Sequence, residues 1–385
     1  MNRKLKNNRT KQSTDDKHSG LLHSARNDVD AYRHCEGDNP KQSTDDKRSG
    51  LLHSVRNDVD ACRHKVTAHD IVKFLLRYVD MMDLSGLYNG KAGLSLALFV
   101  AADHLRDEQL QDTAFRFIKE VLVTKNNDFG FENGLSGIGY TLLYLIEHKF
   151  LETDYDEIFR TQHKDILNHY EQIATNPSLL LTNQTIIYFL SKFAGLKDDP
   201  RIKMIIQKIF EGIELFLTIQ FNDYVDFHYV GVKADVATIY KTYLKLVDYA
   251  GYADFSHSVL EDYIVLCRQG KIISSLETGI YLKKITEKHH IRGYEYIIND
   301  HISNGLKNLH PQTLTLKEKI DLMLLMQHPD NQIKAVDIPL EIVSKRKDDA
   351  LRNVMKTIEL SNPLGYGAGL ARLLIYYTDK NIELL

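Results

Sequence analysis

A glycine-rich phrase that recurs just before apolar helical segments constrains the fold of this chain more than any other feature. Residues 86–93 read GLYNGKAG, and residues 130–137, 44 positions later, read GFENGLSG. They run into LSLALFVAADHL and IGYTLLYLIEH, and a third phrase, NPLGYGAG at 362–369, runs into LARLLIYY. Repetition at an interval of this length indicates helical hairpins that stack on one another.

Weaker copies of the apolar segment continue at this period, and amphipathic segments lie between them. Apolar residues recur at helical spacing in both kinds of segment. The weaker inner copies span 180–193, 229–246, 274–286 and 314–327. The amphipathic segments span 67–83, 107–123, 154–174, 199–219, 255–267, 291–309 and 339–360. We therefore predict an all-α fold of about seven inner and seven outer helices.

The glycines favour an α/α toroid over an open solenoid of the HEAT type. The first glycine of a phrase permits a turn with positive φ, and the last lets neighbouring helices approach closely. Inner helices that converge on an axis need such residues, whereas solenoid repeats do not. We predict a structural role for Gly86, Gly90, Gly93, Gly130, Gly134, Gly137, Gly365, Gly367 and Gly369.

The phrases GLYNGKAG, FENGLSGIGY and LGYGAGLARLL are similar to the glycine-rich repeat of lanthionine synthetase C-like proteins. The resemblance covers roughly residues 67–385 and is clear in the first, second and seventh repeats. It implies a seven-repeat α/α toroid. In the enzymes of this family it also implies a zinc ion, held by two Cys and one His, that activates a peptide thiolate for addition to a dehydroamino acid.

The residues that this resemblance requires for zinc chemistry are missing. The family carries a Cys in the fifth repeat, a Cys-His pair in the sixth, and a catalytic His before a Gly in the fourth. Here 274–279 reads SSLETG, 313–318 reads TLTLKE, and Val230 precedes Gly231. We therefore expect a divergent member without metal or cofactor that binds a peptide or partner protein and assists peptide modification in ribosomal peptide maturation.

If the inner helices converge, their N-termini gather partial positive charge at one face, which suits an anionic or carbonyl-rich ligand. Asn89 and Asn133 are also typical turn and N-cap residues. We expect ligand-binding side chains at this face, namely Tyr88, Asn89, Asn133, Asp226 and Tyr366.

Three residues are candidates for catalysis. Glu132 and Glu277 could form the acid/base pair of an α/α-barrel glycosidase, although carboxylates at these positions more often cap helices. His228 is the best single candidate, although a histidine without an orienting partner is more often structural. A carbohydrate-active enzyme and a helical protein-binding scaffold therefore stay open beside the peptide-related function.

A group of four histidines and the cysteines indicate no metal site. His289, His290, His301 and His310 fall on a charged outer segment, where we expect solvated side chains. Cys267, near the end of an outer segment, is expected to be a small buried hydrophobe. Three cysteines without a CxxC pair also argue against a disulfide framework.

Residues 11–34 and 41–64 are copies of one sequence that differ at three positions. The unit is rich in charged residues and serine, with one Leu-Leu pair, so it cannot bury enough apolar surface to offset its ordering entropy. We predict that residues 1–65 are a disordered leader and that residues 66–385 are the toroid.

Charge and hydropathy exclude several classes of partner. The net charge of −3 gives no basic field for nucleic acid. No apolar run approaches the roughly 18–20 residues of a membrane span, and the basic N-terminus lacks the apolar core of a signal peptide. We expect a cytoplasmic protein that binds neither nucleic acid nor membranes.

Overall fold

A computed structural model describes residues 64–226, 231–327, 343–344, 351–354 and 363–379. Contacts divide the chain into Met1–Ala61 and Cys62–Leu385, and all described residues belong to the second unit. The predicted leader lies almost wholly outside the described residues, as does most of the predicted segment 339–360. Their structures stay predictions.

The described structure is all-α, as predicted, apart from one short ladder. Strand β1 (His64–Lys65) pairs antiparallel with β2 (Val343–Ser344), with His64 opposite Ser344. No helix within the described ranges is long and apolar enough to cross a membrane.

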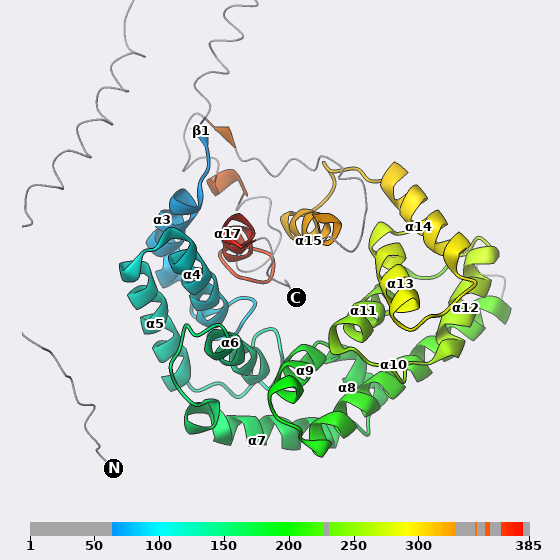
Figure 1. Cartoon of the computed structure of the whole chain (residues 1–385), viewed down its shortest axis with the longest axis horizontal. Coiled ribbons are helices and arrows are strands. Elements are labelled where there is room, and N and C mark those ends of the chain that lie inside the picture. The colour runs from blue at the N-terminus through cyan, green and yellow to red at the C-terminus, as the bar shows by residue number, and fades with distance from the viewer. Residues whose placement is uncertain (1–63, 227–230, 328–342, 345–350, 355–362, 380–385) are drawn as a thin grey trace, which may run out of the picture. The chain divides into compact units, whose positions relative to one another are not determined.

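Within the described ranges, seven helices form an inner layer (Figure 1). Most residues of the first two are buried, as expected for helices that are apolar on all sides. The inner helices are α4 (Lys91–Leu105), α6 (Leu135–Glu147), α9 (Ile186–Leu196), α11 (Ala234–Ala250), α13 (Leu276–Lys288), α15 (Leu316–Gln327) and α17 (Leu370–Thr378). All seven fall on predicted inner segments, although α11 begins later than expected and the short helix α8 (Pro177–Thr182) takes the start of the third segment.

The outer helices bury one face each, and most begin at a residue that can cap them. Thr67 forms a capping box with Asp70, while Asp107 and Asp154 accept hydrogen bonds from the first turns of the following helices. The outer layer consists of α3 (Ala68–Tyr78) with a short 3-10 extension η1 (Val79–Met81), α5 (Glu108–Val123), α7 (Tyr155–Ile173), α10 (Pro200–Asp226), α12 (His257–Arg268) and α14 (Glu295–Lys307).

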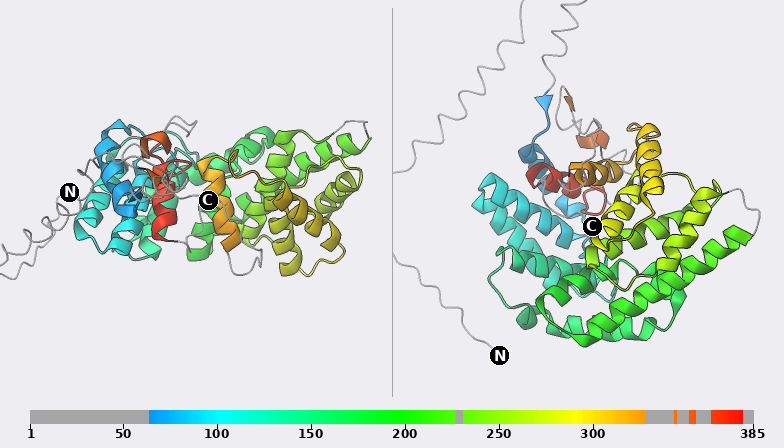
Figure 2. Two further views of the ribbon diagram at one scale, coloured as in Figure 1. Left: turned by 90° about the horizontal axis from the view of Figure 1, so that it is seen from above. Right: turned by 45° about the vertical axis from the view of Figure 1, so that its right-hand side comes forward.

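The inner helices pack in chain order, and the last one returns to the first. Neighbouring contacts lead from α4 through α6, α9 and α11 to α13, and α17 packs against α4 (Figures 1 and 2). Helix α15 packs against α17 and shares a small apolar cluster with α13, formed by Leu276, Ile280, Leu322 and Met326.

The three intact glycine phrases form loops of one geometry. Each helix that follows begins after a glycine N-cap with extended backbone, at Gly90, Gly134 or Gly369. A backbone N–H at the start of each helix donates to a carbonyl seven residues earlier, over 2.9, 2.7 and 2.9 Å for Lys91 to Leu84, Leu135 to Asp128, and Leu370 to Pro363.

The phrase glycines permit close backbone approach rather than positive φ. All nine are described, and none has a positive φ, so our expectation for the first glycine of each phrase was wrong. A Cβ on Gly93 would lie 1.9 Å from the carbonyl oxygen of Leu87 and 2.5 Å from the Cβ of Tyr366. A Cβ on Gly367 would lie 2.8 Å from the ring of Tyr88. The loops therefore require glycine because they touch one another.

We predict that Gly93→Ala lowers the free energy of unfolding by at least about 2 kcal/mol, because the added methyl overpacks a backbone contact. Gly195→Ala is the matched control, since Gly195 lies in α9 and a Cβ there would meet nothing within 4 Å. It should raise stability by up to about 1 kcal/mol through helix propensity. Urea unfolding of both variants measures this, and equal effects would contradict the packing argument.

Candidate functional site

The three glycine loops join through their backbones. The N–H of Tyr88 donates to the carbonyl of Glu132 over 2.6 Å, and the N–H of Gly367 donates to the carbonyl of Tyr88 over 2.9 Å. The half-buried ring of Tyr88 lies 6.1 Å from both Phe131 and the buried Tyr366. The structure thus brings Tyr88, Glu132 and Tyr366 of the predicted site residues together.

Two further predicted residues connect the first and second loops. The amide nitrogen of Asn89 donates to the side-chain oxygen of Asn133 over 3.1 Å. The following helices are capped by glycine, so neither asparagine is an N-cap, contrary to expectation. This side-chain bond supplements the backbone bond between the same two loops.

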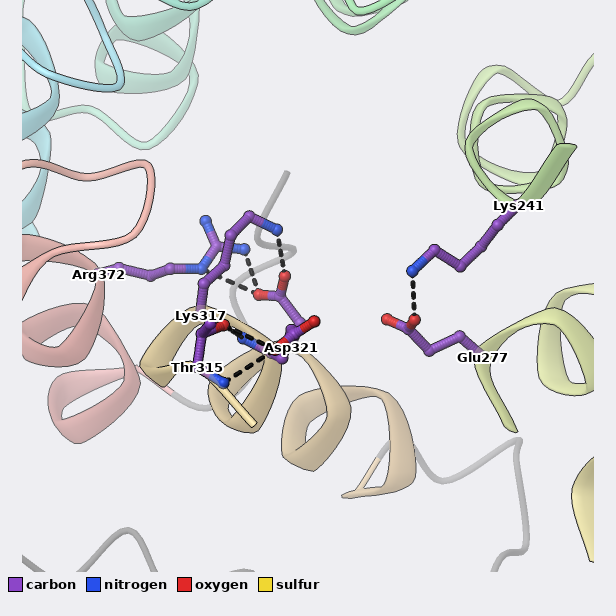
Figure 3. Close-up of polar contacts among 7 residues, drawn as sticks. Lys241, Glu277, Thr315, Lys317, Asp321 and Arg372 are labelled. Carbon is purple, nitrogen blue, oxygen red and sulfur yellow. Dashed lines mark hydrogen bonds and ion pairs between the residues drawn. The ribbon is translucent and has the colours of Figure 1, made fainter. Parts of the chain in front are cut away.

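Charged side chains from the first two turns of α15 and the first turn of α17 meet between the helices (Figure 3). The fully buried Arg372 donates through Nε to Oδ1 of Asp321 over 2.9 Å, and its Nη2 reaches the same oxygen. Lys317 donates to Oδ2 over 2.5 Å. Burial alone would raise the pKa of Asp321, but Arg372, Lys317 and Lys245 outweigh it and lower the pKa to about 2. Asp321 is therefore ionised and holds two cations.

A second pair lies opposite, on α11 and α13. Nζ of Lys241 donates to Oε2 of Glu277 over 2.6 Å. Glu277 thus connects two inner helices, and Ser275 occupies the N-cap position of α13, so the expected capping role of Glu277 was wrong. In Figure 3 this pair faces the group around Asp321.

Lys245, one turn after Lys241 on α11, links the two groups. Its ammonium interacts electrostatically with Asp321, Lys317, Arg372 and Glu277. Burial lowers the pKa of Lys245 to about 8, and the opposing effects of its charged neighbours modify that shift. We name these six residues the charged cluster, which consists of Lys241, Lys245, Glu277, Lys317, Asp321 and Arg372.

Of these six residues, only Glu277 was predicted from the sequence. The signal that was available is a charge inside an otherwise apolar inner segment, as with Arg372 in LARLLIYY and Asp321 in IDLMLLMQ. Charged residues are almost never fully buried unless they are paired, so such positions predict partners on neighbouring helices.

The other predicted site residues do not join the cluster. The side chain of Glu132 is exposed and makes no hydrogen bond or ion pair with the residues that the structure describes. Glu132 therefore caps no described helix, and α6 begins at Gly134 instead. Asp226 is exposed at the end of α10. His228 lies outside the described residues, so its role stays a prediction.

A separate polar group holds the start of α13. The backbone N–H of Ser275 donates to Nδ1 of His301 over 3.0 Å, so the ring proton is on Nε2. That nitrogen lies 3.1 Å from the hydroxyl of Tyr263 and 3.6 Å from Sγ of Cys267. His301 is 2% exposed, and our expectation of a solvated side chain was wrong for this residue. The group joins α12 and α14 to α13.

Cys267 is half-buried in this group, close to its expected role. Burial raises the pKa of its thiol to about 12, so the thiol is protonated and a poor nucleophile at neutral pH. His290 and His310 are exposed as expected, and His289 is half-buried against Phe255. Across the described ranges, no three or more His, Cys, Asp or Glu side chains are grouped to hold a metal ion.

Comparison with known proteins gives a match to part of the chain. Residues 50–216 match the family model described as lanthionine synthetase C-like protein. The matched range contains the first two glycine loops and the helices from α3 into α10. The matched range is less than half of the chain, and it supports a relationship to lanthionine synthetase C-like proteins. No curated protein and no solved structure matches it.

We predict that Arg372→Met lowers the free energy of unfolding by about 3–5 kcal/mol, because it removes one partner of a buried ion pair. Combining it with Asp321→Asn should cost at least about 1 kcal/mol less than the sum of the single changes. Denaturant unfolding of the single and double variants measures this coupling.

The control is Arg201→Met, which removes the exposed pair with Glu171 at 2.8 Å. Exposed pairs contribute less than about 1 kcal/mol. Strict additivity of the two changes at Arg372 and Asp321 would show that the buried pair is not coupled.

We predict that His301 contributes stability that is lost in acid. Burial lowers its pKa, so the unfolded chain takes up the proton at higher pH than the folded chain does. Stability is therefore complete above the ordinary pKa of about 6.5 and falls as the pH drops below it. His301→Gln should be less stable than the parent at pH 7.5, and the difference should narrow by pH 5. A constant difference between the two unfolding curves would contradict the assignment.

Proposed function

We propose that this lanthionine synthetase C-like protein binds a peptide and assists its modification during ribosomal peptide maturation, without zinc-dependent cyclisation. The observation that carries the proposal is the charged cluster on the inner helices. Glu277, Lys317 and Arg372 lie in the first turns of their helices, and Lys241, Lys245 and Asp321 lie further along theirs. The family match supports a lanthionine synthetase-related function, and the cluster supports binding rather than metal chemistry.

The residues of the fifth and sixth repeats do not fit a zinc ion. The resemblance places zinc ligands at the starts of these inner helices, where this chain carries Ser275, Glu277 and Lys317. An ammonium group has donors only and cannot ligate a cation. The nearby carboxylates of Glu277 and Asp321 already accept from lysine or arginine. We therefore derive no step through zinc.

The same groups suit a peptide. Ammonium groups donate hydrogen bonds to backbone carbonyls and carboxylates, and helix N-termini add partial positive charge. Glu277 and Lys317 each lie second in their helix, and Arg372 lies third. An extended chain that presents carbonyl oxygens would meet complementary donors here.

The two alternative functions receive less support. A glycosidase needs two carboxyl groups in acid and base roles, but Glu277 is bound by Lys241 and Glu132 is an exposed loop residue. A scaffold that only binds at its outer surface has no need of charges on inner helices, which are costly to desolvate.

We predict that the full chain, purified after growth with added zinc, carries well below one zinc ion per chain and that zinc does not raise its melting temperature. A peptide encoded beside its gene, labelled with a fluorophore, should bind in fluorescence anisotropy, and its scrambled form should bind at least tenfold more weakly. Metal analysis and anisotropy test the two parts separately. Stoichiometric, tightly held zinc would contradict the metal-free part, and equal binding of the scrambled peptide would contradict the other.

A further inference from the structure

We infer that the charged cluster binds an oxyanion of the peptide, a phosphoryl or carboxylate group, between Lys241 and Lys317. This inference rests on the proposed function and adds the chemical class of the group that is recognised. Lys241 lies on α11 and pairs with Glu277, whereas Lys317 lies on α15 and pairs with Asp321 (Figure 3).

Both lysines have donors to offer. An ammonium group carries three N–H donors, and each lysine donates once to its own carboxylate. Their side chains are 36% and 37% exposed, so an incoming group can reach them. Figure 3 shows the two ion pairs facing each other, and the ammonium of Lys245 interacts with both Lys317 and Glu277, so the two lysines share one electrostatic environment.

The surroundings favour negative charge between the two lysines. In the part of the chain that the structure describes, the cluster holds four cations and two carboxylates. Like charges in a partly desolvated place repel one another, and an oxyanion relieves that repulsion. The pKa of Lys245 is lowered chiefly by burial; Asp321 and Glu277 raise it, and Lys317 and Arg372 lower it.

The ion pairs also prepare the site. Asp321 holds Lys317, and Glu277 holds Lys241, so less side-chain freedom is lost when a ligand binds. Arg372 is fixed by Asp321 and lies over the ring of Tyr366, with 5.7 Å between the guanidinium carbon and the ring centre. The buried guanidinium adds positive charge near the more exposed Lys241 and Lys317.

A second ion pair between α11 and α13 serves as a control for the cluster. Lys284 of α13 pairs with Asp248 of α11 at 3.2 Å, toward the other ends of the two helices. Its side chains are only 22% and 18% exposed. This pair matches one cation with one carboxylate, and we expect it to connect the helices without binding a ligand.

The test titrates the full chain with inorganic phosphate and with three synthetic peptides that are identical except for a central phosphoserine, aspartate or serine. Phosphate should raise the melting temperature more than chloride at equal ionic strength. By calorimetry, the phosphoserine or aspartate peptide should bind at least tenfold more tightly than the serine peptide. The difference between the phosphoserine and aspartate peptides identifies the oxyanion.

Variants locate the site. Lys241→Met and Lys317→Met should each weaken binding of the anionic peptide at least tenfold, while Lys284→Met should leave it within twofold. Circular dichroism checks that each variant is folded, and the phosphate shift of the parent chain tests the site without any variant.

Two results would overturn the inference. One is equal binding of the three peptides, which would leave the proposed peptide binding intact. The other is an anion preference unaffected by both lysine changes or equally reduced by Lys284→Met. Phosphate binding without binding of any peptide would instead support the anion site and count against the proposed function.

Discussion

The backbone of Tyr88 forms hydrogen bonds with two other glycine loops, and the arrangement of the first, second and last inner helices depends on these bonds. Its N–H reaches the second glycine loop and its carbonyl reaches the seventh. Backbone hydrogen bonds between neighbouring loops require a separation that a Cβ would prevent. A Cβ on Gly86 would lie 2.3 Å from the Cα of Asn133, and one on Gly365 would lie 2.2 Å from the carbonyl oxygen of Tyr88. The first, second and seventh repeats are thereby fixed relative to one another through main-chain atoms.

The later repeats achieve the same positioning with side chains. No glycine phrase precedes α13, and His301 instead accepts from the N–H of Ser275 while Gly305 lets the start of α13 pack tightly against α14. Between α15 and α17, the pairing of Arg372 with Asp321 connects the helices. Hydrogen-bonded side chains that are buried give specificity only when they are satisfied, so these contacts constrain the choice of residue at each position.

Helical periodicity was enough to predict the layers, because burial of one face or of all faces leaves a direct record in the pattern of apolar residues. The charged cluster was not predictable in this way. Asp321 and Arg372 are 51 residues apart in the sequence, and their pairing depends on which inner helices are neighbours. Likewise, His301 looks solvated on a charged segment, and only the approach of Tyr263 and Ser275 accounts for its burial. Local patterns predict elements, whereas these partners depend on tertiary packing.

Helix α15 divides its apolar contacts between two clusters, with Ile320 in the main core. The helix packs against α17, and other side chains form a small cluster with α13, separate from the main core. It also supplies both Lys317 and Asp321. By thermodynamic linkage, any ligand that engages Lys317 only while α15 is docked transfers part of its binding free energy to that docking. Ligand binding at the charged cluster would then increase the fraction of molecules in which α15 is docked. The docking of α15 is therefore the property of the fold that a bound ligand would change most.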